Sequence, residues 1–267
     1  MIRNKIITII FIVVYFFVTF CGNSDFKTVY YINGQKVTEK EFNDNGGSGK
    51  VKVYKEGKLL QEAELKDGKL HGQSIEYFSN GKISNIKEYR NGKKHGKFTE
   101  WFKGGQIKSQ GYFEYRNAKL NYKLTEWYEN GKTKKEVEVT EGVGKAIEWY
   151  KNGRKFIEYE LRNELKNGKY KMWFKGGNTL IEGIYKNGEM NGKWVEYYKN
   201  GQKKTEYNYD EGTLHDKIIK WYENGQIEMK CLYVNGKKEG KWISWDKNGN
   251  LLSEEIWKDG KLVKKSK

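Results

Sequence analysis

The stretch Trp221-Tyr222-Glu223-Asn224-Gly225 places two aromatic residues and one charged residue before Asn-Gly. Asn-Gly favours positive φ at both central positions of a tight turn, and the twist of such a turn matches that of paired strands. Aromatic residues are common in strands. The stretch therefore predicts a strand that ends in a tight hairpin turn.

The same pattern recurs along the chain, with 22 to 26 residues from one copy to the next and about 24 on average. A regular period of this length indicates a repeat protein, whose units pack on their neighbours. The glycines that mark the pattern are Gly34, Gly57, Gly81, Gly105, Gly131, Gly153, Gly177, Gly201, Gly225 and Gly249.

A second turn is expected about eleven residues after each marker glycine, so that every repeat contains two strands. Glycine then arrives too often for long helices, and the absence of proline suits continuous strand pairing. We predict an all-β fold, an elongated open antiparallel sheet of about ten stacked hairpins over residues 28–263. The glycines assigned to the second turn are Gly68, Gly92, Gly168, Gly188, Gly212, Gly236 and Gly260, with Ala118 at this point in the fourth repeat.

Two columns of side chains are expected to stack on one face of this sheet and form a thin core. Only 36% of the residues are hydrophobic but 15% are aromatic, as such a core requires. One column lies three residues before the marker glycines and runs from Tyr31 to Tyr222, and the other lies eight residues after them and runs from Phe42 to Trp257. The opposite face should carry a row of tryptophans, which we take as candidate binding residues: Trp101, Trp127, Trp149, Trp173, Trp221 and Trp245.

The first 21 residues are typical of an export signal. Arg3 and Lys5 precede an apolar run over residues 6–20, which is short for a membrane-spanning helix. Cys21 stands where a bacterial lipoprotein is cleaved and acylated, and residues 22–27 would be a short spacer. Phe20 replaces the small residue usual before that cysteine, so an uncleaved anchor, conventional cleavage and the absence of export stay open as alternatives. Under the lipoprotein interpretation, the chain is exported and anchored to the cell envelope or surface.

The chain carries 51 Lys and Arg against 35 Asp and Glu, a net charge of +16, and it ends in a basic tail at residues 264–267. Lysines on exposed strands discourage sheet-to-sheet pairing, and we expect the regularly placed glutamates to pair with them. The alternative interpretation of the charge is attraction to an anionic surface. Nucleic acid is not an expected partner of an exported chain.

No catalytic arrangement is evident in the sequence. The two cysteines form no Cys-x-x-Cys pair, and we predict that the chain is not an enzyme and needs no cofactor or metal. His71, His95 and His215 share one position of the repeat, which a repeated turn explains; a metal site shared by His71 and His95 is the alternative.

The repeat resembles the MORN repeat in its MORN-2 variant, as found in YwqK-type antitoxin repeat proteins. The resemblance rests on the aromatic-aromatic-x-Asn-Gly-Lys pattern and on stretches such as Gly96-Lys97-Phe98-Thr99-Glu100 and Gly192-Lys193-Trp194-Val195-Glu196. It implies stacked β-hairpins and leaves the partner to the surface residues. We expect a non-enzymatic, envelope-anchored scaffold for a protein or glycan. An exported antitoxin that masks a toxin and a scaffold that binds anionic membranes are the alternatives.

Overall fold

The computed structural model describes residues 26–116 and 118–266. The expected export signal and Cys21 lie outside these residues. The chain divides between Gly131 and Lys132 into two compact units, which we call the N-terminal unit and the C-terminal unit.

The N-terminal unit contains one short helix and the first nine described strands. Its elements are β1 (Phe26–Ile32), β2 (Gln35–Val37), α2 (Glu39–Asp44), β3 (Gly49–Lys55), β4 (Lys58–Lys66), β5 (Lys69–Tyr77), β6 (Ile83–Arg90), β7 (Lys93–Trp101), β8 (Ile107–Arg116) and β9 (Lys119–Trp127).

The C-terminal unit is built from strands alone in its described part. They are β10 (Thr133–Thr140), β11 (Val143–Trp149), β12 (Lys155–Arg162), β13 (Leu165–Trp173), β14 (Thr179–Lys186), β15 (Glu189–Tyr197), β16 (Lys203–Asp210), β17 (Thr213–Leu214), β18 (Asp216–Trp221), β19 (Ile227–Val234), β20 (Lys237–Trp245), β21 (Leu251–Lys258) and β22 (Lys261–Ser266).

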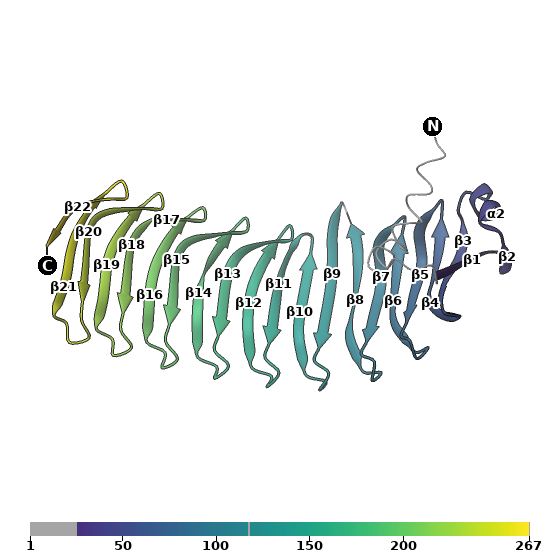
Figure 1. Ribbon diagram of the computed structural model, residues 1–267, viewed down its shortest axis with the longest axis horizontal. Coiled ribbons are helices and arrows are strands. Elements are labelled where there is room, and N and C mark those ends of the chain that lie inside the picture. The colour runs from purple at the N-terminus through teal and green to yellow at the C-terminus, as the bar shows by residue number, and fades with distance from the viewer. Residues whose placement is uncertain (1–25, 117, 267) are drawn as a thin grey trace. The chain divides into compact units, whose positions relative to one another are not determined.

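Within each unit the strands form an antiparallel sheet in which neighbours in sequence are also neighbours in space (Figure 1). The prediction of an all-β fold of stacked hairpins is therefore confirmed. The observed array extends beyond the expected residues 28–263 at both ends. β1 begins at Phe26, and β22 includes residues 264–266 of the expected tail.

The two turns of each repeat differ in geometry. In the second turn both central residues have positive φ, as at Asn91 (51°) and Gly92 (80°), and this conformation produces the tightest hairpins. At the marker turns from Gly81 onward only the glycine has positive φ, and its N–H donates to a carbonyl three residues earlier. The marker turns are therefore longer than the sequence predicts.

In two of the second turns, the residue with positive φ just before the next strand is not a glycine. Gly168 lies within β13, and the turn before it is formed by Asn163 (φ 49°) and Glu164 (φ 67°). Ala118 takes φ 60° where most other repeats have glycine.

The most buried row of side chains is not the one that the sequence predicts. It occupies the third position of the Gly-Lys-x stretches, where Phe98, Trp194 and Trp242 are at most 9% exposed. Glycines on neighbouring strands face this row. Gly111 lies against Phe98, and Gly183 lies against Trp194. Large side chains on one strand thus fill the space that small residues leave on the next.

The expected column three residues before the marker glycines contributes to the turns. From Phe78 onward these residues follow the ends of strands and are only half-buried. The hydroxyls of Tyr150, Tyr198 and Tyr222 donate to carbonyls 23 residues further along the chain, at 2.7–2.9 Å. Of the second column, Val139 and Leu161 are buried.

Phe42 belongs to α2 and not to a strand. Thr38 caps this helix and forms a capping box with Glu41, whose carboxylate accepts from the Thr38 N–H at 2.7 Å. Phe42 is fully buried and its ring lies 5.0 Å from that of Tyr30. The helix therefore covers the hydrophobic cluster at the start of the N-terminal unit.

Replacing Gly183 with alanine is expected to destabilise the C-terminal unit by about 1–3 kcal/mol, since the added methyl group would collide with the buried indole ring of Trp194. Gly176 provides the control, because a methyl group there meets open space. Urea unfolding followed by circular dichroism measures both variants, and equal midpoints would contradict the role of Gly183.

Candidate functional site

The six tryptophans proposed as binding residues share one structural position. Each is the last residue of its strand, and each is half-buried. Trp101 and Trp127 lie in the N-terminal unit, and the other four lie in the C-terminal unit, where Tyr197 takes the same place at the end of β15. Half-buried indoles have one edge fixed by packing and one edge in water, which suits contact with a ligand.

Lysines approach two of these rings in the C-terminal unit. The ammonium groups of Lys155 and Lys171 lie 5.7 and 5.9 Å from the centre of the Trp173 ring. Lys203 is 5.7 Å from the centre of the Trp221 ring. These distances are near the outer limit of cation–π attraction.

A second row, made of lysines, lies four residues before the aromatic row on the same strands. Side chains alternate between the faces of a strand, so residues four apart share a face. This row is not among the binding residues predicted from the sequence. Its members are Lys145, Lys169, Lys193, Lys217 and Lys241, each exposed and each 24 residues from the next.

Glutamates on the intervening strands can each bind one lysine of this row and one further lysine. Glu158 binds both Lys145 and Lys155, and Glu206 binds Lys193 at 2.7 Å and Lys203 at 2.9 Å. The expected pairing of lysine with glutamate is therefore observed. Burial alone would raise the pKa of Glu206, but the hydrogen bonds and charges of the two lysines lower it overall.

Glu182 occupies the centre of this arrangement. Its carboxylate accepts from Lys171 at 2.7 Å and from the Tyr197 hydroxyl at 2.6 Å, and these bonds lower its pKa. Burial and the neighbouring Glu182 raise the pKa of Tyr197 to about 12, so that this hydroxyl stays a donor. The network fixes one aromatic ring of the row to one ion pair.

A hollow of about 770 Å³ lies over this part of the C-terminal unit. The hollow is lined by Trp173 and Tyr197 and also by lysines of the lysine row. The aromatic row and the lysine row therefore lie on one face. We call the surface of the C-terminal unit that carries the two rows the aromatic–lysine face. Lining residues used below are Lys145, Lys169, Lys171, Trp173, Lys193 and Tyr197.

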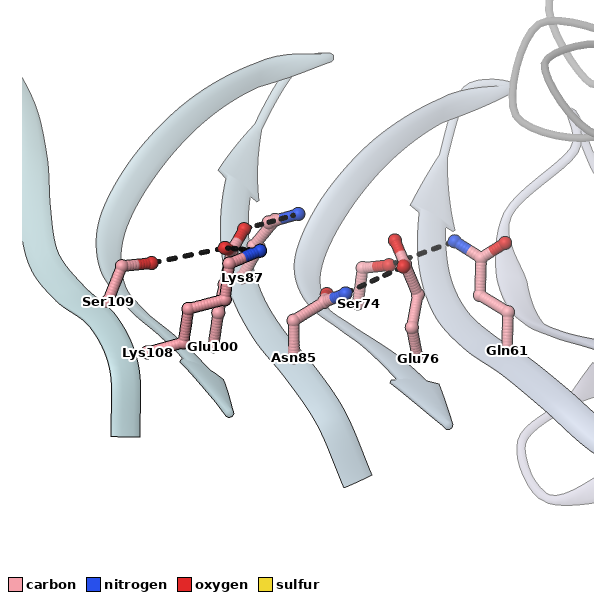
Figure 2. A network of polar contacts seen from close by, with 8 residues as sticks. All are labelled: Gln61, Ser74, Glu76, Asn85, Lys87, Glu100, Lys108 and Ser109. Carbon is pink, nitrogen blue, oxygen red and sulfur yellow. Dashed lines mark hydrogen bonds and ion pairs between the residues drawn. The ribbon is translucent and has the colours of Figure 1, made fainter. Parts of the chain in front are cut away.

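The N-terminal unit carries a different, polar stripe (Figure 2). Asn85 donates to Glu76 at 2.6 Å, and Gln61 donates to Ser74 at 3.2 Å. Ser74 and Asn85 are both buried. Hydrogen-bonded polar groups inside a sheet constrain which residues lie opposite one another, so this stripe is best explained as fixing the register of β4 to β6.

Glu100 closes the stripe on the side of β8. It accepts from Ser109 at 3.1 Å and lies 3.3 Å from the ammonium of Lys87 and 3.7 Å from that of Lys108 (Figure 2). Burial alone would raise the pKa of Glu100, but these cations and the Ser109 hydroxyl lower it overall. The carboxylate therefore stays ionised and satisfied, as a structural group does.

Two of the three histidines that share one repeat position contact the next turn. His71 Nδ1 lies 3.3 Å from the Asn91 side chain, and His215 Nδ1 accepts from the Asn235 N–H at 3.4 Å. Both contacts join residues 20 positions apart, so the recurrence reflects a bridge between repeats. Among the described residues, no group of three or more His, Cys, Asp or Glu side chains has the arrangement of a metal site.

Two further observations concern membranes and cysteine chemistry. None of the described helices has the length and apolar character that crossing a bilayer requires. Cys231 is buried in the C-terminal unit, and this burial raises the pKa of its thiol to about 11. A thiol in that state is a poor nucleophile, and it packs against Ile218 and Trp242.

Acid is expected to lower the thermal stability of the C-terminal unit through Glu182 of the aromatic–lysine face. Because the pKa of Glu182 is lower in the folded state, its contribution is complete above the ordinary carboxyl pKa and is lost as the pH falls through the folded value. The melting temperature should therefore drop below about pH 5. Calorimetry on Glu182→Gln should show a smaller drop, and on Glu223→Gln, an exposed turn variant, the full one.

Comparison with known proteins identifies the repeat. The model of a MORN repeat variant matches residues 70–91, 94–115, 190–211, 217–235 and 238–259. No curated protein matches the chain. The crystal structure of TcdB2-TccC3 without its hypervariable C-terminal region is 12% identical over 90% of this chain, which spans 14% of that chain, and the TM-score of 0.17 supports no comparison of folds. Two of the matched segments lie in the N-terminal unit and three in the C-terminal unit, so MORN-variant repeats occur in both units.

Proposed function

We propose that the chain is a non-enzymatic binding scaffold that holds an elongated protein or glycan on the aromatic–lysine face. The observation that carries the proposal is the repetition of half-exposed aromatic rings and exposed lysines at one spacing, on one face. Such a surface presents an aromatic ring and a lysine at regular intervals along the sheet. It therefore suits a partner that is itself extended.

Anchorage to the cell envelope is the second part of the proposal. It rests on the export signal at residues 1–21 and on Cys21. Palmitate labelling of the full chain should be lost in Cys21→Ser. Labelling that persists in this variant would reject acylation at Cys21.

The binding role is tested by capture of partners from cell envelopes with the full chain. Trp173→Ala combined with Trp221→Ala should abolish capture, because these substitutions remove two rings of the face that lysines approach. Tyr112→Ala combined with Tyr115→Ala is the matched control, since both are exposed aromatic residues outside the tryptophan row. Melting temperatures establish that all variants are folded.

The outcomes separate this role from the alternatives. Capture that survives the double substitution would reject the aromatic–lysine face as the binding surface. A captured toxin whose activity the chain suppresses would instead support the exported antitoxin role, which the resemblance to antitoxin repeats suggests. Sedimentation with anionic vesicles, unaffected by the tryptophan substitutions, would support a membrane scaffold driven by the net charge of +16.

A further inference from the structure

The two rows of the aromatic–lysine face have a common period. Both occur on β11, β13, β15, β18 and β20, which are every second strand of the C-terminal unit. Since neighbouring strands lie about 4.8 Å apart, each row presents one group roughly every 10 Å. Within a strand, the lysine and the aromatic residue are four positions apart, or about 13 Å.

The lysine row has low charge density. Glutamates from the intervening strands already neutralise part of it, because Glu158, Glu206 and Glu254 bind Lys145, Lys193 and Lys241. Lys169 and Lys217 differ from these three, since neither ammonium has an acidic partner in the described part of the chain. The face therefore offers cations at intervals, separated by carboxylates that would repel a densely charged polymer.

The period and the charge density together select the partner. Nucleic acid carries a phosphate about every 3.4 Å along each strand of a duplex, and acidic residues on one side of an extended peptide recur about every 7 Å. A polysaccharide with one carboxylate per disaccharide carries its charges at about the interval of this row. Its sugar rings also present C–H faces of the kind that indole rings contact.

We propose that the aromatic–lysine face binds an acidic polysaccharide that carries about one carboxylate per disaccharide. Every second carboxylate would pair with Lys169 or Lys217, which lie two periods or about 20 Å apart, and the sugar rings would pack on Trp173, Tyr197 and Trp221. This assignment rests on the proposed binding role of the face and names its ligand class. The ammonium groups of Lys155 and Lys171 lie over the Trp173 ring, and both would move away when a sugar ring packs on it.

Titration calorimetry with the full chain tests the assignment. The probe is a hyaluronan oligosaccharide, which has one carboxylate per disaccharide, and the matched neutral probe is the same oligosaccharide with its carboxylates reduced to alcohols. The acidic probe should bind at least about tenfold more tightly, because only it can pair with the row. It should also change the tryptophan fluorescence, which contact with lysines elsewhere on the surface would not do.

Two double variants locate the contact. Lys169→Gln with Lys217→Gln should weaken binding about fivefold and should reduce its salt dependence, and it breaks no ion pair of the fold. Lys237→Gln with Lys261→Gln removes the same charge from exposed lysines outside the row, and it should change the affinity less than twofold.

Several results would overturn the assignment. These are equal binding of the acidic and reduced probes, equal effects of the two lysine pairs, and tighter binding of oligothymidylate or polyglutamate at the same ionic strength. If hyaluronan fails while Trp173→Ala with Trp221→Ala still abolishes capture from envelopes, the binding role stands and the glycan assignment alone is wrong. If both fail, the aromatic–lysine face is not a binding surface.

Discussion

Replacing Trp194 with alanine is expected to lower the free energy of unfolding of the C-terminal unit by about 3–5 kcal/mol. Trp194 is only 1% exposed, and its indole N–H donates to the Ile184 carbonyl at 3.1 Å. The rings of Tyr170 and Tyr185 lie 5.4 and 5.2 Å away, the second perpendicular to it. Alanine would leave a cavity at the one place where the neighbouring strand has a glycine, so nothing could fill it.

Urea unfolding and amide hydrogen exchange measure this effect. Exchange should accelerate first in β13, β14 and β15, because a repeat protein loses structure locally before it unfolds as a whole. Ile184→Ala is the control, since the Ile184 carbonyl accepts the Trp194 hydrogen bond but its side chain is 48% exposed, and it should cost less than about 1 kcal/mol. Similar losses for the two variants would show that Trp194 is not the centre of the core.

The second large effect is expected at the start of the N-terminal unit. Phe42→Ala should destabilise this unit by about 3–5 kcal/mol, because Phe42 is fully buried between Tyr30 and Val51. Ile32, Val37 and Leu65 pack against the same cluster. Removal of the ring would therefore separate α2 from the sheet.

Limited proteolysis and hydrogen exchange across β1 to β3 measure this loss. Thr38→Ala is the comparison, since it removes the helix cap but keeps Phe42, and it should cost about 1 kcal/mol. If protection of β1 to β3 survives in Phe42→Ala, the helix is held by contacts other than this ring.

The strands and turns were predictable because Asn-Gly and the period of 24 residues report local backbone geometry directly. The packing was less predictable. The aromatic column before the marker glycines was assigned to the core, but those residues follow strand ends, where the longer turn redirects them. Trp194 was within a quoted motif, yet its burial depends on Gly183 of the neighbouring strand, a contact that strand register decides.

Two other features of the structure also leave a recognisable pattern in the sequence. Thr38 and Glu41 form a capping box, which predicts the start of a helix even among strands. The lysine row recurs every 24 residues, but lysine is so common in this chain that its period is hidden among turn residues. The role of the tryptophans as binding residues stays a prediction.

The tyrosine hydroxyls that reach 23 residues ahead have a consequence for how such a chain can change in length. Tyr198 bonds to the strand that ends at Trp221, and Tyr222 bonds to the one that ends at Trp245. Each of these links spans one repeat and its successor. Duplication or deletion of a whole 24-residue segment between two tyrosine-bearing repeats of the C-terminal unit would thus restore this link at the junction, and would lengthen or shorten the aromatic–lysine face by about 10 Å. Recombination between repeats could then adjust the reach of the protein in fixed steps without redesigning its core.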